Sequence, residues 1–294
     1  MNIQLLLNIQ LLISGLSSGI IYGLIAMGMV MIFRTVGVMN FAQGEFLMVG
    51  GYLCYTFNRL LNWSIGFALL ASAVLMGLLG VVFMLTSYWP LRQAQPRAII
   101  VSAMGASMFM KEGAQLVWGP LPVTIDRVVD GVVNVFGARV QSQNLAIIVC
   151  AVACMMFVYI LLEKTFIGHI MQATAQDQYM SSMVGVPVVA SIGMTFALSA
   201  VMTGIGGGLL APLFFLTSSM GVTAGAKAFA AIVIGGFGSV TGAIVGGFIV
   251  GLVEAFGGAY ISTTYQLVLI YIVLILMLML RPQGLFGTKI HDKA

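Results

Sequence analysis

Long apolar runs alternate with short polar connections along almost the whole chain. An α-helix needs about 20 predominantly apolar residues to cross a bilayer, and about eight segments approach that length. They lie at residues 11–33, 36–57, 64–85, 98–118, 145–162, 188–210, 228–256 and 265–280. The pattern predicts an all-α, polytopic integral membrane protein with a single transmembrane domain, residues 1–294. We expect the first run to be kept as a span, because residues 1–10 lack the basic region and cleavage site of a signal peptide.

Two polar stretches are long enough to leave the bilayer, and the first covers residues 119–144. Its β-branched runs around Gly131 and Gly137 predict a small hairpin. We expect this loop on the extracytoplasmic side. Its charged residues are Asp126, Arg127, Asp130 and Arg139.

The second polar stretch, residues 163–187, predicts a short amphipathic helix along the cytoplasmic membrane surface. Thr174 and Asp177 have the spacing of a capping box, and Pro187 ends the helical pattern. The apolar side of this helix is formed by Met180, Met183 and Val184. An ordinary solvated connector is the alternative.

Lys and Arg near the segment ends usually indicate orientation, but here they do so weakly. With residues 163–187 and the tail in the cytoplasm, that side holds Arg34, Arg92, Arg97, Lys164, Arg281, Lys289 and Lys293, and the outer side holds Arg59, Lys111, Arg127, Arg139 and Lys227. Three full crossings after residue 187 would place the tail outside. We therefore expect a broken or re-entrant segment, and the glycine cluster at 235–247 is the best candidate for a turn at membrane depth.

The composition excludes several classes of protein. Hydrophobic residues make up 61% of the chain and charged residues only 7%, against roughly 25% charged in a soluble domain. The net charge of +4 is scattered singly, which argues against nucleic-acid binding. Cys54, Cys150 and Cys154 lie in apolar stretches, so we interpret them as small core residues rather than as disulfides or metal ligands.

The motifs of enzymes and nucleotide-binding proteins are missing from the sequence. His169 and His291 are the only histidines, and no phosphate loop occurs. We expect no catalytic residue, cofactor or metal, and ATP, if it is used, must bind elsewhere. Among the glycines, those at 206–208, 246 and 247 are interpreted as sites of close helix packing. The run Gly235 to Ser239 is interpreted as a helix break beside a solute pathway.

Polar side chains also interrupt an apolar segment at residues 40–45. An ionisable group at membrane depth is costly, so Glu45 should have a partner or line a cavity. The alternative is an interfacial glutamate near Arg34. Glu254 poses the same question, whereas Lys111 and Glu112 lie near an expected boundary where snorkelling explains them.

Four motifs in this order resemble one family, the permease subunits of branched-chain amino acid ABC importers, of the LivH type. The resemblance covers essentially the whole chain. The motifs are Asn40-Phe41-Ala42-Gln43-Gly44-Glu45-Phe46 followed by Gly50-Gly51-Tyr52, Ala173-Thr174-Ala175-Gln176-Asp177 with Gly185 and Val186 downstream, Gly235-Gly236-Phe237-Gly238-Ser239-Val240-Thr241-Gly242-Ala243, and Leu280-Arg281-Pro282-Gln283-Gly284-Leu285-Phe286-Gly287.

The resemblance implies a multi-pass subunit of the bacterial inner membrane that carries leucine, isoleucine and valine. The implied partners are a related second permease in a heterodimer, two cytoplasmic ATPase subunits and a periplasmic or lipid-anchored solute-binding protein, besides membrane lipid; nucleic acid is not implied. Residues 163–187 would be the coupling helix. The candidate pathway residues are Asn40, Gln43, Gly44, Glu45, Gly235, Gly236, Gly238 and Ser239, and the candidate coupling residues are Gly168, Ala173, Thr174, Asp177 and Gly185.

This chain departs from the family pattern where arginines tend to occur in the coupling stretch, because it has His169, Gln172 and Gln178 there. Three alternatives remain open. The cargo could be another amino acid, an amide or urea. The chain could be a self-contained secondary transporter or channel, although only Glu45 and Glu254 could couple ions at midplane. A membrane-embedded enzyme is disfavoured, because no nucleophile and base match in depth.

Overall fold

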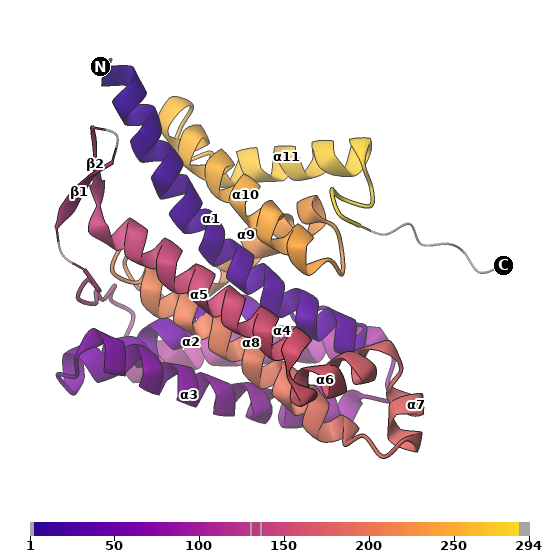
Figure 1. Cartoon of the computed structure of the whole chain (residues 1–294). Coiled ribbons are helices and arrows are strands. Elements are labelled where there is room, and N and C mark those ends of the chain that lie inside the picture. Colours follow the sequence, from indigo (N-terminus) through magenta and orange to yellow (C-terminus); the bar gives the residue numbers. More distant parts are fainter. Residues whose placement is uncertain (1–2, 130, 136, 288–294) are drawn as a thin grey trace.

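The computed structural model describes residues 3–129, 131–135 and 137–287, and this part of the chain is mostly helical (Figure 1). The helices are α1 (Ile3–Val36), α2 (Gln43–Tyr55), α3 (Ile65–Phe83), α4 (Pro96–Trp118), α5 (Ser142–Lys164), α6 (Phe166–Gln176), α7 (Gln178–Met183), α8 (Val188–Leu210), α9 (Met220–Gly235), α10 (Val240–Tyr260) and α11 (Gln266–Leu280). The π-helix η1 (Thr56–Leu60) extends α2, and the π-helix η2 (Met84–Tyr88) and the 3-10 helix η3 (Trp89–Leu91) extend α3. Four residues named above, Asp130, Lys289, His291 and Lys293, lie outside the described residues.

Five helical stretches in the described part are long and apolar enough to cross a membrane, which confirms the all-α, polytopic architecture. They are Gln4–Val36, Ile65–Leu91, Ser142–Lys164, Val188–Leu210 and Val240–Tyr260, and the shorter apolar helices are Met220–Gly235 and Gln266–Leu280. In the most apolar part of α1, 89% of the residues are buried, against 22% in α5. Figure 1 shows why: α1 runs diagonally through the molecule, with α10 on one side and α5 on the other.

The outer helices present apolar stripes to their surroundings. In α3, Leu70, Val74, Leu78 and Val82 are exposed, while the interleaved residues Ala68, Ser72, Met76 and Gly80 are buried. Residues four apart lie on one face of a helix, so α3 has one face toward the protein and one face toward lipid.

The predicted segment at residues 228–256 requires a correction, because it forms two helices. The helix α9 ends at Gly235, the chain turns through residues 236–239, and α10 packs back against α9. The turn lies beside Arg34 in the last turn of α1, so it is at the end of a span and not at membrane depth as expected. With 16 residues, α9 is about 24 Å long and falls short of the roughly 30 Å hydrocarbon core.

Glycines allow the central helices to approach closely. A Cβ atom on Gly207 of α8 would lie 1.9 Å from the carbonyl oxygen of Leu47 in α2, and one on Gly246 would lie 1.9 Å from the carbonyl oxygen of Ala231 in α9. On Gly247, it would lie 2.5 Å from the backbone nitrogen of Gly23 in α1. The interpretation of these three glycines as packing residues is confirmed.

The two polar stretches lie at opposite ends of α1. The first contains the predicted hairpin, in which β1 (Val132–Val135) pairs antiparallel with β2 (Ala138–Gln141). Near the start of α1, the Nε2 atom of Gln10 donates a hydrogen bond to the carbonyl oxygen of Arg139, 2.8 Å away. Near its end, the carbonyl oxygen of Thr35 accepts a hydrogen bond of 2.6 Å from the Nε2 atom of Gln178.

The second stretch forms two short helices, so the predicted single helix and its capping box are wrong. Thr174 lies inside α6, where its hydroxyl donates to the carbonyl oxygen of Ile170. Asp177 has an extended backbone (φ −157°, ψ 107°) that interrupts the helix. Its Oδ1 atom accepts a hydrogen bond of 2.9 Å from the backbone N–H of Met180, so Asp177 is the N-cap of α7.

Candidate functional site

The polar motif at residues 40–45 lies where α2 begins. Residues 37–42 between α1 and α2 are not helical, and Asn40 is buried, with its Oδ1 atom accepting from the backbone N–H of Ala42. The Nε2 atom of Gln43 lies 2.7 Å from the hydroxyl of Ser199 and 2.6 Å from that of Thr203. Both hydroxyls belong to the middle of α8, which is long enough to span the membrane. Thus α2 begins beside the middle of α8, with Asn40, Ala42 and Gln43 buried in protein.

Glu45, two residues further along the motif, is 1% exposed. Its Oε1 atom accepts a hydrogen bond of 3.3 Å from the hydroxyl of Ser107 in α4, and its buried Oε2 atom has no partner among the described residues. The carboxylate lies against Gly221 at the start of α9, where a Cβ atom would come within 2.3 Å of Oε2. The alternative of an interfacial glutamate near Arg34 is therefore wrong.

The second predicted pathway segment, Gly235 to Ser239, forms the turn between α9 and α10. Gly236 and Gly238 have φ angles of 114° and 77°, which disfavour residues with a Cβ atom. The hydroxyl of Ser239 accepts from the backbone N–H of Gly242 and caps α10. On the outside of the turn, the Nε atom of Arg34 donates to the carbonyl oxygen of Gly238.

The last motif, residues 280–287, packs on the same turn. The backbone N–H groups of Leu285 and Phe286 donate to the carbonyl oxygens of Ile234 and Gly235, at 3.0 and 2.8 Å. Sequence reasoning missed this contact, because the paired residues are about 50 positions apart and neither segment has a β-strand pattern.

The candidate pathway residues thus form two clusters. A chain of aromatic contacts between the clusters runs from Phe41 through Phe229 to Phe237, with ring centroids 6.1 and 6.3 Å apart. The second cluster lines a cavity of about 640 Å³ through Ser239. The other polar residues that line this cavity are Arg34, Thr35, Tyr159, Glu163, Gln172, Gln176, Thr195 and Thr241.

The candidate coupling residues divide into internal and exposed positions. Gly168 and Thr174 are buried, and a Cβ atom on Gly168 would lie 2.2 Å from the carbonyl oxygen of Leu161 in α5, so Gly168 fixes the bend between α5 and α6. Ala173 is partly buried. Asp177 and Gly185 are exposed, and Gly185 has a φ of 86°. Among the candidate coupling residues, the exposed Asp177 and Gly185 are therefore the ones that another protein could contact directly.

Three polar residues of the coupling stretch, Gln172, Gln178 and His169, all lie within hydrogen-bond distance of backbone oxygens of this chain. Gln172 donates to the carbonyl oxygen of Leu162 at 2.8 Å, and Gln178 donates to that of Thr35. The Nδ1 atom of His169 lies 2.7 Å from the carbonyl oxygen of Thr165. These side chains fasten α6 and α7 to the ends of α5 and α1.

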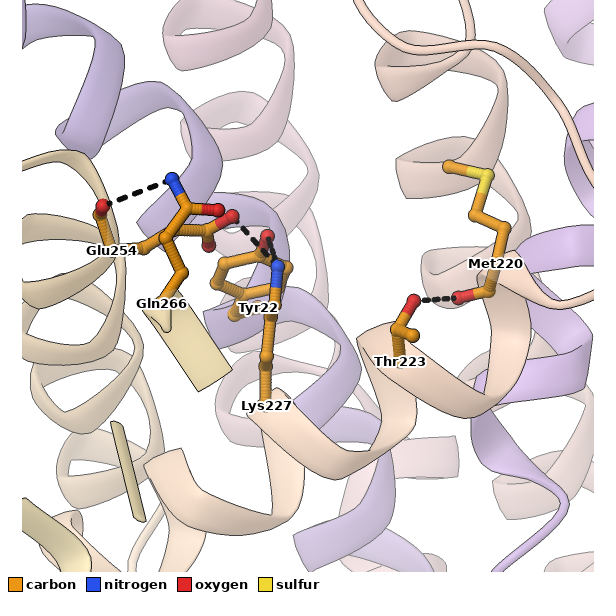
Figure 2. A network of polar contacts seen from close by, with 6 residues as sticks. All are labelled: Tyr22, Met220, Thr223, Lys227, Glu254 and Gln266. Atoms are coloured by element: carbon orange, nitrogen blue, oxygen red, sulfur yellow. Dashed lines mark hydrogen bonds and ion pairs between the residues drawn. The ribbon is translucent and has the colours of Figure 1, made fainter. Parts of the chain in front are cut away.

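An ion pair that the sequence interpretation missed lies between α9 and α10 (Figure 2). The Nζ atom of Lys227 lies 2.7 Å from Oε1 of Glu254 and 3.1 Å from the hydroxyl of Tyr22 in α1. The Lys227 side chain is only 16% exposed, so it lies inside the protein rather than on its surface. The sequence did contain a signal for this pair: Lys227 and Glu254 carry opposite charges and are isolated in apolar segments. Ionisable groups in such segments usually pair with each other inside the protein.

Comparison with known proteins decides the family. Residues 11–278 match the family described as "Branched-chain amino acid transport system / permease component". The chain belongs to this permease family. It is therefore a membrane transport subunit and not an enzyme, and the match extends from α1 almost to the end of α11.

Relatives of this permease are similar over their whole length. The high-affinity branched-chain amino acid transport system permease protein LivH of Escherichia coli K12 is 30% identical, and the LivH protein of Salmonella typhimurium is 31% identical, with 100% of each chain covered. The permease protein BraD of Pseudomonas aeruginosa is 30% identical over 97% of both chains. The permease is accordingly a multi-pass protein of the inner membrane.

Proposed function

We propose that this permease provides part of the translocation pathway of an ATP-driven importer for leucine, isoleucine and valine. Full-length similarity to permeases named for branched-chain amino acids supports this cargo. The main structural support is the start of α2, where the buried side chain of Gln43 is hydrogen-bonded to hydroxyl groups in the middle of α8. Broken helices of this kind place backbone and side-chain polar groups beside solutes near the midplane.

The proposed assembly contains a related second permease, two cytoplasmic ATPase subunits and a periplasmic or lipid-anchored solute-binding protein. The chain has no phosphate-binding loop, so ATP hydrolysis belongs to separate subunits. This need for an external energy source distinguishes the proposal from a self-contained secondary transporter or channel.

Coupling to the ATPases takes place through α6 and α7, which we place in the cytoplasm, with the hairpin on the outer side. The end of this segment exposes Tyr179, Met180, Met183 and Val184, by 65%, 60%, 65% and 84%. Exposed apolar clusters rimmed by polar residues are typical of protein interfaces. Rocking of α6 and α7 by the ATPases would move the ends of α1 and α5, to which these helices are bonded.

The deciding experiment is uptake of radiolabelled leucine into vesicles that contain the permease, its partner permease, the ATPases and the binding protein. We expect uptake to require ATP and every component. Leucine entry through this chain alone would favour a channel or secondary transporter instead. Uptake of a different amino acid, an amide or urea by the complete assembly, without leucine uptake, would correct the cargo and keep the mechanism.

A further inference from the structure

The Lys227–Glu254 pair lines a cavity of about 200 Å³ between α1, α9, α10 and the segment before α9. One wall is charged and polar, with the Tyr22 hydroxyl beside the pair. Leu210, Phe214, Phe215 and Met220 form an apolar wall, and the hydroxyl-bearing residues Thr217, Ser219 and Thr223 also line the cavity. A cavity below the roughly 300–1,000 Å³ of drug-sized pockets suits a small solute with one charged and one apolar end.

The charged groups of this pair retain unused binding capacity within the described residues. Glu254 is 8% exposed, and its buried Oε2 atom has no hydrogen-bond partner there. The Lys227 ammonium donates to Glu254 and Tyr22, which engages two of its three donors. Figure 2 shows Lys227 reaching from α9 toward Tyr22 and Glu254, with Gln266 next to Glu254.

A purely structural role explains this pair poorly. Desolvation of two charges offsets much of their attraction, and well-packed apolar residues often stabilise the same site as well or better. The neighbouring contacts between α1 and α10 are already made by glycines such as Gly19 and Gly251. Ionisable groups inside a membrane protein mark solute or ion pathways by default.

We propose that Lys227 and Glu254 bind the zwitterionic backbone of an amino acid during its passage. Lys227 takes the carboxylate, Glu254 takes the ammonium group, and the apolar wall receives an aliphatic side chain. This inference rests on the proposed import of amino acids. It assigns backbone recognition to the pair, which lies apart from the motif at residues 40–45.

A route into this site comes from the end of the molecule that carries the hairpin. Phe214 lines both the 200 Å³ cavity and a second cavity of about 570 Å³, which Arg139 and Gln141 of the hairpin also line. Along α1, Ser14 and Ser18 line the second cavity and Tyr22 lines the first. These three residues are four positions apart, so one face of α1 joins the two cavities.

The test uses Ser219→Cys, because Ser219 is exposed and lines the cavity. In the complete reconstituted assembly, a small thiol reagent modifies this position, and the parent with its three native cysteines gives the background. We expect leucine to slow the modification. Leucinamide, which lacks the carboxylate, and 4-methylpentanoate, which lacks the amine, should not slow it.

Variants of the pair then separate binding from folding. We expect Lys227→Gln and Glu254→Gln to raise the half-protecting leucine concentration by about tenfold or more, because each removes one charge-assisted contact. The double variant Lys227→Glu with Glu254→Lys keeps an ion pair but reverses the zwitterion, so it should assemble in normal amounts and still lose protection. The matched control is Lys111→Gln, because Lys111 also lies near a glutamate: its Nζ atom is 3.7 Å from Oε1 of Glu112. In this control variant, leucine should still slow the modification of the introduced cysteine.

Leucine uptake by the same assemblies distinguishes the two proposals. The zwitterion site is overturned, and the proposed importer is unaffected, if leucine is taken up but does not protect the introduced cysteine. The same conclusion follows if leucinamide protects the cysteine as well as leucine does. Wild-type protection in the double charge-swap variant overturns the site as well. Protection by leucine in an assembly that imports no leucine supports the site and contradicts the proposed cargo.

Discussion

The side-chain nitrogen of Gln43 lies 2.6 Å from the hydroxyl oxygen of Thr203, so the first residue of α2 is fixed to the middle of α8. The same nitrogen also donates to the hydroxyl of Ser199, and the Nδ2 atom of Asn40 donates to the side-chain Oε1 atom of Gln43 at 3.3 Å. This fully buried network holds a helix end inside the protein.

Replacing Gln43 by leucine should destabilise the permease, because it leaves buried polar partners unpaired. The expected loss is about 1–3 kcal/mol of unfolding free energy, measured as a lower thermal unfolding midpoint of the purified protein in detergent. The exposed Gln93→Leu is the matched control and should unfold as the wild type does. Equal midpoints for the two variants would show that the network does not support the fold.

Gly207→Ala should separate α2 from α8. The added Cβ atom would meet the carbonyl oxygen of Leu47, and backbone atoms in a packed core cannot yield easily. We expect a loss of about 1–3 kcal/mol in stability. In Gly105→Ala the new methyl group meets nothing within 4 Å, and the better helix propensity should keep or raise the unfolding midpoint.

Glu45→Gln should lower leucine uptake while the amount of protein in the membrane stays normal. The amide keeps the size of the side chain and can still bond Ser107, but it removes the buried ionisable carboxyl group beside Gly221. Uptake in reconstituted vesicles measures the effect, with Glu112→Gln as the control, since the Glu112 side chain is 64% exposed. Unchanged uptake would remove Glu45 from the pathway.

Charge reversal at Asp177 should weaken the association of the permease with its ATPase subunits. Asp177→Lys changes the charge and also removes the cap of α7, whereas Asp177→Asn removes the charge and keeps a good capping side chain. Co-purification of the ATPases should fall strongly for the first variant and less for the second. Asp126→Lys, near the hairpin, should have no effect, and normal co-purification of Asp177→Lys would contradict the coupling assignment.

Labelling of introduced cysteines should reveal the orientation. Asn134 in the hairpin and Tyr179 in α7 are both exposed. In intact spheroplasts, a membrane-impermeant thiol reagent should modify Asn134→Cys, and it should modify Tyr179→Cys only after lysis. The reverse pattern would invert the proposed orientation.

Local sequence patterns were sufficient to predict most of the helical segments, the hairpin and the helix break at Gly235 to Ser239. Each depends on neighbouring residues: apolar length sets a span, β-branched residues between glycines favour a hairpin, and clustered glycines end a helix. The same patterns misplaced the cap of α7, because Thr174 and Asp177 fit a capping box equally well when the backbone angles of Asp177 are unknown.

The sequence by itself determined that this is a helical membrane protein and where its apolar segments and polar stretches lie, because bilayer thickness acts on each segment separately. Tertiary structure alone decided that Lys227 meets Glu254, that Arg34 holds Gly238 and that Leu285 pairs with Ile234. These partners are 27, 204 and 51 positions apart, so only the packing of helices brings them into bonding distance. The physical reason is that a hydrogen bond or ion pair needs two atoms within about 3 Å, and no local pattern encodes the second atom.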